Sequence, residues 1–302
     1  MKPKRTRFDV NGVVLVDKPL GYSSNQTLAL VKKYFNPKKA GHTGTLDPLA
    51  TGLLPVCLGE ATKFSSFLLE SDKSYEASIK LGFISSTGDS EGEIECIKIK
   101  NFPTLGEVQK VINSFLGYQE QLPPMFSALK FKGKPLYEYA RKGENIDRKK
   151  RKINITSLKI KEYKDNIIHI NVSCSKGTYI RVLANDIGAS LKTGGYLVGL
   201  RRLAIGKITI KEAVNINLIE EMNAQSRKDL IHPIDTLIRE FGKIILEEKD
   251  VKAIKDGRTL LLKNYGEGIY RLYANEDIFL GLGSLDLYGY LKAKRLRATN
   301  KN

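Results

Sequence analysis

The chain has 302 residues, of which 41% are hydrophobic, so it is long enough to bury a sizeable core, and its length favours two domains. Fifty Lys and Arg against 33 Asp and Glu give a formal net charge of +17, which indicates a polyanionic partner, nucleic acid first. Three scattered cysteines predict neither disulfides nor a zinc site, and the apolar run at 13–16 is too short for a signal peptide or membrane span, so we expect a cytoplasmic protein with no membrane contact.

Segments typical of strands and helices alternate through the first part of the chain. Residues 13–16 predict a buried strand, and Ser23 or Ser24 can cap a helix that runs to about Tyr34. Residues 55–59 predict a short buried strand, followed by a helix at 61–69. From Ser74, apolar and polar residues alternate, which predicts a strand buried on one face.

A capping box at Thr104 predicts a helix that ends before Gly117. Its expected apolar face consists of Leu105, Val108, Val111, Ile112, Phe115 and Leu116. A second alternating pair of segments, joined at Asp165 and Asn166, predicts a hairpin, and a loop leading into a helix follows it. After Phe241 the sequence changes to short strand-like pieces with one helical stretch, which predicts a separate small β domain.

The segment between the capped helix and the hairpin is strongly basic. From Ala128 to Lys152 it carries ten Lys or Arg against three acids, with Phe131, Tyr137 and Tyr139 interleaved. Basic side chains follow a phosphate backbone and aromatic rings stack on exposed bases, so this composition favours RNA held in a groove. A solvated loop, or a localisation signal at RKKRK, is the alternative.

The stretch GHTGTLDPLATG, residues 41–52, places a single carboxylate, Asp47, in a glycine-rich turn. The glycines permit close approach of a ligand to the backbone, and a carboxylate held there can act as nucleophile or base. The alternative is a plain turn, because Asp before Pro is common in turns. The chain has no nucleotide-binding glycine motif and no metal-binding motif, so no cofactor and no metal are expected.

Read as a string, GHTGTLDPLATGLLPVCLGEATK resembles the signature of the TruB family of tRNA pseudouridine synthases. The resemblance continues in order through LVDKPLGYSSN, KSY, TGDSEG, PPMFSALKFKGKPLYEYAR, CSKGTYIRVLANDIG and LRRLAIG, and so covers residues 11–206. The tail from about 242 to 297 is similar to a PUA domain, a small RNA-binding β barrel.

The resemblance implies an α/β fold, with a mixed and largely antiparallel sheet flanked by helices, plus a small C-terminal β barrel. It divides the chain into a catalytic domain at 1–240, with an RNA-clamping insertion at about 123–152, and a PUA-like domain at 241–302. The implied reaction is isomerisation of uridine 55 in the T-loop of tRNA to pseudouridine, without cofactor or metal. The implied partner is the T-arm stem-loop, with no obligatory protein partner and a monomeric enzyme.

The resemblance also assigns roles to individual residues. Asp47 is the implied catalytic nucleophile, which attacks C1′ or the uracil ring or acts as a base toward the ribose; these alternatives stay open. Tyr75 stacks on the flipped base, and Arg181 orients Asp47. The expected substrate-binding residues are His42, which fills the space the base leaves in the stack, with Tyr75, Tyr179, Leu200, Lys18 and Asp89. The expected RNA-binding residues are Lys130, Lys132, Arg141, Lys149, Lys150 and Arg151.

Two other functions remain possible interpretations of the same motifs. One is a guide-RNA-dependent pseudouridine synthase subunit, which shares the aspartate motif but relies on partner proteins. The other is a non-catalytic RNA-binding or tRNA-folding protein, in which the loop at 41–52 only recognises RNA.

Overall fold

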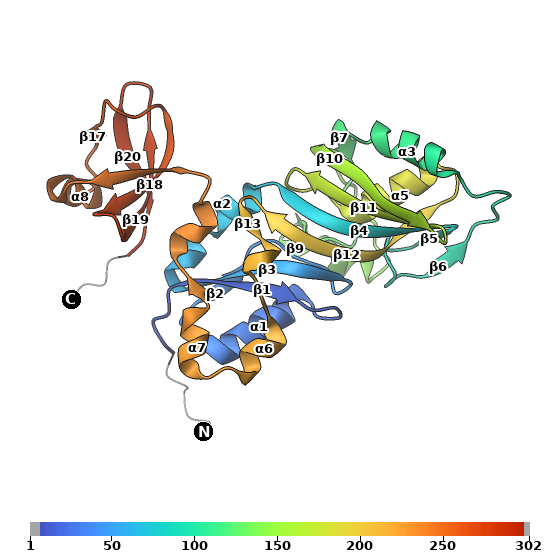
Figure 1. Ribbon diagram of the computed structural model, residues 1–302, viewed down its shortest axis with the longest axis horizontal. Coiled ribbons are helices and arrows are strands. Elements are labelled where there is room, and N and C mark those ends of the chain that lie inside the picture. The colour runs from blue at the N-terminus through green and yellow to red at the C-terminus, as the bar shows by residue number, and fades with distance from the viewer. Residues whose placement is uncertain (1–6, 299–302) are drawn as a thin grey trace.

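The computed structural model describes residues 7–298; most of the basic start of the chain and the last four residues lie outside this range. Two sheets dominate it, a long twisted one and a smaller one formed by the C-terminal residues (Figure 1). None of the helices within 7–298 is long and apolar enough to cross a lipid bilayer.

The large sheet has eleven strands, eight of them in one continuous path. In sheet order these are β14 (Val214–Asn215), β1 (Gly12–Lys18), β3 (Ala50–Leu58), β12 (Gly195–Ile205), β4 (Lys73–Leu81), β11 (Ile167–Cys174), β10 (Arg151–Lys164) and β7 (Gly117–Gln121). The short strands β2 (Ala40–His42), β13 (Ile208–Thr209) and β15 (Ile231–His232) pair with β3, β12 and β1. Among the strands of this sheet within residues 7–298, only the pairs β1–β14 and β3–β12 are parallel. The sheet is therefore mixed and largely antiparallel, as predicted.

Helices cover the sheet where its side chains are apolar. These are α1 (Ser24–Phe35), α2 (Ser65–Glu70), α3 (Leu105–Ser114), α5 (Ile180–Ser190) and α6 (Ile216–Glu221). The short helix α4 (Leu136–Ala140) lies in the basic insertion, and α7 (Ala224–Asp229) follows α6. Strands β1 and β3 are buried on both faces, which explains the uninterrupted VVLV run. Strand β4 alternates, and its buried face packs with α3 and α5 into one core.

The C-terminal sheet has five strands in the order β16 (Gly242–Leu246), β18 (Gly268–Ala274), β19 (Ile278–Leu285), β20 (Tyr290–Leu296) and β17 (Leu260–Leu261), with α8 (Glu248–Lys255) beside it. It curls into a half-barrel (Figure 1). Phe279 packs edge-on against Phe64 of the larger part and against Tyr273 of its own sheet, with ring centroids 5.5 Å apart in each pair. The C-terminal sheet thus has an aromatic contact with Phe64, just before α2, and the domain boundary at 240/241 stays a prediction.

The capped helix α3 is shorter than its sequence pattern suggests. It ends at Ser114, so Leu116 lies beyond it and is exposed, and Leu105 at the first turn is 57% exposed. The part that packs on the sheet is centred on Val108 and Ile112. The predicted apolar face is therefore correct only in its middle.

The helix predicted at 61–69 is split in two. A 3₁₀ turn, η1, occupies Gly59–Lys63, and α2 begins at Ser65. The Thr62 hydroxyl donates to Gly59 O at 2.8 Å and the Ser65 hydroxyl donates to Thr62 O at 3.0 Å. Such side-chain bonds compete with the regular helical pattern, which explains the break.

Two strands extend further than predicted. Strand β3 starts at Ala50 rather than at residue 55, because the Thr51–Gly52 segment, which resembles a turn in sequence, pairs with β12. Strand β10 starts within the basic run at Arg151 and pairs with β7, which the sequence pattern did not reveal. The basic insertion therefore begins and ends on two paired strands.

Candidate functional site

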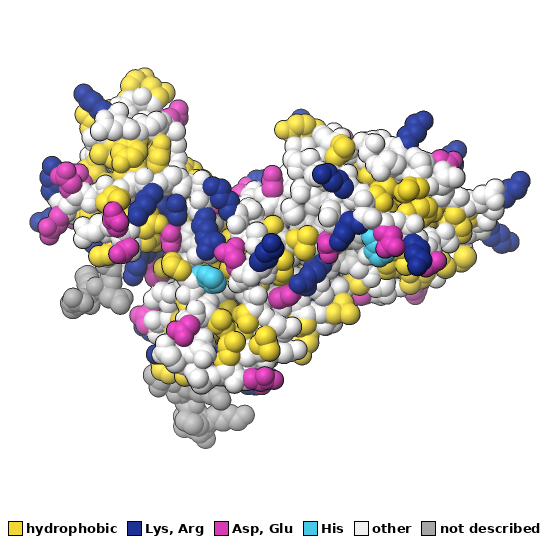
Figure 2. Space-filling model, viewed as in Figure 1, with side chains coloured by type: hydrophobic (Ala, Val, Ile, Leu, Met, Phe, Trp, Pro, Cys, Tyr) yellow, Lys and Arg dark blue, Asp and Glu magenta, His cyan; other side chains and the backbone are white. Residues whose placement is uncertain are grey.

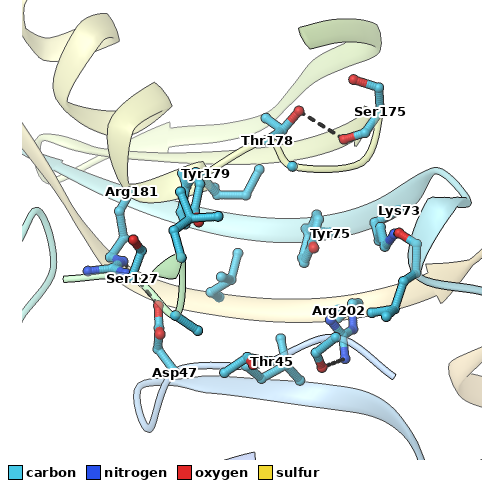
Figure 3. A pocket seen from close by; sticks show the side chains of 18 of the residues that line it. Thr45, Asp47, Lys73, Tyr75, Ser127, Ser175, Thr178, Tyr179, Arg181 and Arg202 are labelled. Carbon is cyan, nitrogen blue, oxygen red and sulfur yellow. Dashed lines mark hydrogen bonds and ion pairs between the residues drawn. The ribbon is translucent and has the colours of Figure 1, made fainter. Parts of the chain in front are cut away.

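The residues around the loop at 41–52 line a pocket of about 620 Å³, with a second cavity of about 480 Å³ beside it. Six of the predicted site residues line the first pocket: His42, Asp47, Tyr75, Tyr179, Arg181 and Leu200. They come from the end of β2 and the loop that follows it, from β4, from the start of α5 and from β12. Figure 3 shows Asp47, Tyr75, Tyr179 and Arg181 around one space.

The loop that carries Asp47 is hydrogen-bonded to the start of α1. The buried Ser24 hydroxyl accepts a hydrogen bond from Leu46 N at 2.8 Å and lies 2.9 Å from Leu46 O. Gly44 has a φ of +79°, a conformation that side chains other than glycine rarely adopt. Asp47 O accepts from Ala50 N at 3.0 Å, which closes the turn at Pro48. The Asp47 carboxylate is consequently held at the pocket wall, 38% exposed.

Arg181 lies between two carboxylates. Its Nε is 3.0 Å from Asp47 Oδ2 and 3.5 Å from Asp89 Oδ2. Its other two nitrogens donate to backbone carbonyls, those of Thr87 at 3.1 Å and Phe126 at 2.7 Å. Because the guanidinium is 7% exposed and bonded on every side, its orientation and that of Asp47 are coupled.

Burial raises the pKa of Asp47 above its ordinary value, and the nearby Asp89 adds to the rise. Arg181 and Lys18 act in the opposite direction. Arg181 lowers the pKa of Asp47, as expected of a neighbouring cation, but burial raises this pKa by more.

Asp89 is 2% exposed and lies on the far side of Arg181. It accepts hydrogen bonds from the Thr87 hydroxyl at 2.6 Å and from Glu91 N at 3.0 Å. It lines the second cavity together with Asp47 and Arg181, so the two carboxylates flank the same guanidinium.

Lys18 is fully buried at the end of β1 and lines neither cavity. Its ammonium donates to the carbonyls of Pro19, at 3.0 Å, and Tyr22. Burial lowers its pKa to about 8, while the charge of Asp47 opposes this shift. The backbone of Lys18 pairs with Gly52 of β3, at the end of the loop that carries Asp47.

Three of the remaining predicted residues form walls of the pocket. Tyr75 is 9% exposed on β4, where it also belongs to the core, and Leu200 of β12 packs against the same core. Tyr179 stands immediately before α5. His42 is partly buried, and burial, followed by the charge of Arg202, lowers its pKa, so the ring is held neutral.

The predicted RNA-binding residues divide into two groups. Lys130 and Arg141 line the second cavity, and the Arg141 guanidinium lies over the Tyr137 ring at 5.3 Å. Lys132, Lys149, Lys150 and Arg151 are exposed and line neither cavity. The insertion lies behind the large sheet in Figure 1, whereas on the face drawn in Figure 2 Lys and Arg are interspersed with Asp and Glu.

Sequence reasoning missed three polar residues at the pocket, of which Arg202 and Gln121 are buried and Lys73 is partly buried. Arg202 and Lys73 line it, and Gln121 of β7 bonds to both backbone groups of Tyr179, accepting from its N–H at 2.8 Å and donating to its carbonyl at 3.1 Å. Arg202 stands two residues after Leu200 in LRRLAIG and Lys73 two residues before Tyr75, so each was adjacent to a residue already singled out. Gln121 had no signal, because its role depends on strand pairing.

Comparison with known proteins places these residues in a family. The model described as "TruB family pseudouridylate synthase (N terminal domain)" matches residues 32–180, and that described as "Pseudouridine synthase II TruB, C-terminal" matches residues 242–296. Two relatives called tRNA pseudouridine synthase B are similar over almost their whole length. That of Methylobacillus flagellatus is 43% identical over 98% of each chain, and that of Azoarcus sp. is 45% identical over 99% of each chain.

Solved structures show the same fold at lower identity. The chain aligns to one in the crystal structure of a Cbf5-Nop10-Gar1 complex with a TM-score of 0.73 at 23% identity, covering 94% of this chain and 84% of that one. It aligns to one in an H/ACA RNP bound to a substrate RNA containing 2′-deoxyuridine with a TM-score of 0.72 at 20% identity, covering 99% and 93%. With relatives above 40% identity along nearly its full length, this chain belongs to the TruB family of pseudouridine synthases.

Proposed function

We propose that this protein converts uridine 55 in the T-loop of tRNA to pseudouridine, acting alone and without a cofactor. The observation that carries the proposal is the Asp47 carboxylate at the wall of an open pocket, 3.0 Å from Arg181 and facing two tyrosines and Leu200. The names of the similar bacterial proteins, tRNA pseudouridine synthase B, support tRNA as the substrate.

In the proposed reaction the bond between ribose C1′ and uracil N1 breaks, the base turns, and C1′ bonds to C5. The proton on C5 is lost and N1 gains one, so the product has the same atoms as the substrate. Asp47 supplies the negative charge that the cleavage step requires, as nucleophile or as base, and Arg181 holds the carboxylate toward the pocket. Cleavage of the C1′–N1 bond and formation of the C1′–C5 bond need no electron acceptor and no metal.

A uridine in a folded T-loop has to leave its stack before Asp47 reaches it, which requires a few kcal/mol of unstacking energy. The flat and largely buried Tyr75 offers a surface on which the extruded base can stack, with Tyr179 and Leu200 on the other walls. The neutral ring of His42, at the rim shared by both cavities, is suited to fill the vacated space. That Lys130 and Arg141 line the second cavity supports a role for them in contacting phosphates of the same RNA.

The test is to incubate the purified protein, without cofactor or partner, with an unmodified T-arm stem-loop and with an anticodon-arm stem-loop, and to map pseudouridine in both. We expect conversion at the single T-loop position, abolished in Asp47→Asn and kept in Asp256→Asn, a matched change at an exposed aspartate of the C-terminal part. Tight binding without conversion would favour a guide-dependent subunit or an RNA-folding protein.

A further inference from the structure

Arg202 lies in β12 between the two strands that bear the pocket. It is paired with Gly52 of β3, the strand that follows the Asp47 loop, and with Tyr75 of β4. Gly52 has a φ of +102°, and a Cβ there would lie 2.4 Å from Arg202 O, so only glycine allows the strands to approach this closely. The backbone of Arg202 is thus in direct contact with both the strand that follows the Asp47 loop and the strand that carries Tyr75.

The Arg202 side chain connects the same two halves a second time. Its Nε donates to Leu53 O at 2.8 Å and its Nη2 donates to Gly44 O at 3.2 Å. These two carbonyls lie on opposite sides of Asp47 in the sequence, so one planar guanidinium spans the base of the loop (Figure 3). It also lies beside the Tyr75 hydroxyl; burial raises the pKa of this phenol and Arg202 opposes the rise.

Arg202 is unusual because it is a buried cation without an anion. It is 1% exposed, and among residues 7–298 it forms no ion pair with a carboxylate. Its neighbour Arg201 shows the ordinary arrangement, since it is 39% exposed and bonds to Asp17 at 2.7 Å. Burying an arginine costs desolvation free energy, and the cost is larger when no carboxylate pairs with it. A folded protein tolerates such a buried arginine only where the hydrogen bonds of its guanidinium are needed.

We propose that Arg202 is a positioning residue that holds the loop at 41–52, and with it Asp47, in register with the Tyr75 strand. Pairing of β2 with β3 and of residues 50–52 with β12 fixes the two ends of the loop. Between them the loop is held by bonds from Thr43 N to Pro55 O at 3.1 Å and from Gly21 N to Pro48 O at 2.9 Å and by the Ser24 contact at Leu46, and Arg202 adds the bond at Gly44 O. A lysine at 202 keeps the charge but cannot reach two carbonyls in one plane, and a methionine keeps only the stem. This inference rests on the proposed function of Asp47.

The test compares Arg202→Met, Arg202→Lys and the matched control Arg201→Met with the unsubstituted protein. Three quantities are measured: the single-turnover rate at saturating T-arm stem-loop, the Kd for that RNA, and amide hydrogen exchange of the peptide covering 41–52 without RNA. We expect Arg202→Met to lower the rate by about 100-fold, since small misplacements of reacting groups have effects of that size. Its Kd should stay within about threefold of wild type.

Exchange at 41–52 should become at least about tenfold faster in Arg202→Met. Arg202→Lys should show most of both losses, and Arg201→Met neither. A rate within about twofold of wild type would overturn the proposal, as would weaker RNA binding at an unchanged rate or full recovery in Arg202→Lys. If Arg202→Met does not fold, Arg202→Lys decides: a slow rate with fast loop exchange supports the proposal, and wild-type values overturn it.

The exchange measurement needs no RNA, so it separates the two hypotheses. A wild-type protein that modifies no T-loop uridine would refute the proposed function while leaving the loop comparison intact. Unchanged protection of the loop in Arg202→Met would refute the role of Arg202 even in an active enzyme.

Discussion

Arg181→Met tests whether the two carboxylates of the site are held by one cation. The substitution removes the contacts to Asp47 and Asp89 and two hydrogen bonds to carbonyls, those of Thr87 and Phe126. It leaves Asp89, 2% exposed, as a buried charge with only the Thr87 hydroxyl and Glu91 N as partners. Removing one member of a buried pair destabilises proteins by about 3–5 kcal/mol, and we expect a loss in this range.

The double variant Arg181→Met/Asp89→Asn should recover about 1–3 kcal/mol of this loss, because the asparagine removes the unpaired charge and keeps an oxygen that can accept. Both variants should be inactive, since neither orients Asp47. The measurement is urea unfolding followed by circular dichroism, with comparison of midpoints at an unchanged slope. The control is Arg201→Met, whose partly exposed pair should contribute no more than about 1 kcal/mol.

The reasoning would be refuted if Arg181→Met lost less than about 1 kcal/mol, which would mean that Asp89 is not a buried anion dependent on Arg181. It would equally fail if Asp89→Asn brought no recovery in the Arg181→Met background.

Three further predictions concern charge and packing elsewhere. Burial lowers the pKa of Lys18 to about 8, so between about pH 8 and pH 10 the unfolded chain binds more protons at Lys18 than the folded protein does, and the contribution of Lys18 to stability rises with pH. The free energy of unfolding in urea should therefore rise less between pH 7.5 and pH 9.5 in Lys18→Met than in the unsubstituted protein. An equal rise in both would exclude this pKa. Replacing all four residues 149–152 by alanine should weaken binding of the T-arm stem-loop and reduce the slope of log K against log salt by about 1–3, where an unchanged slope would remove the segment from the interface. Phe279→Ala, which removes the aromatic contact with Phe64, should lower the free energy of unfolding in urea by about 3–5 kcal/mol. The control Leu287→Ala, at a side chain that is 67% exposed, should change that free energy by no more than about 0.5 kcal/mol. Similar losses in both variants would mean that the Phe64–Phe279 contact contributes little to stability.

The parts of the fold that sequence predicted are those in which local signals and packing agree. Ser23 caps α1 and Asn36 ends it in a left-handed conformation, and β4 alternates because one face is buried. The hairpin turns at Asp165 and Asn166, both at positive φ. Strand β7 was missed because Gly117–Gln121 has little apolar character and is defined by its pairing with β10.

The same division holds for the candidate site. The motif strings identified Asp47, Tyr75, Tyr179, Arg181 and Leu200, and the structure brings these five to one pocket, although their roles stay predictions. Residues that act through backbone groups were not predictable. Gln121 and Arg202 bond to carbonyls and an amide that become neighbours only after folding; Arg202 stands in a quoted motif, but nothing in the local sequence marks these bonds.

The basic insertion has a consequence for how this protein can change. Because Gln121 pairs with Arg151, the segment between them leaves and re-enters the sheet at adjacent points. A segment bounded in this way can be lengthened, shortened or exchanged with small effect on the free energy of folding, because loop entropy varies slowly with length. The start of the insertion belongs to the site, since Phe126 O bonds to Arg181 and Ser127, Ala128 and Leu129 line the pocket. The natural graft point is therefore the exposed part after Arg141: exchanging residues 142–150 for another basic loop offers a route to redirecting the chemistry toward another RNA while these pocket residues are kept.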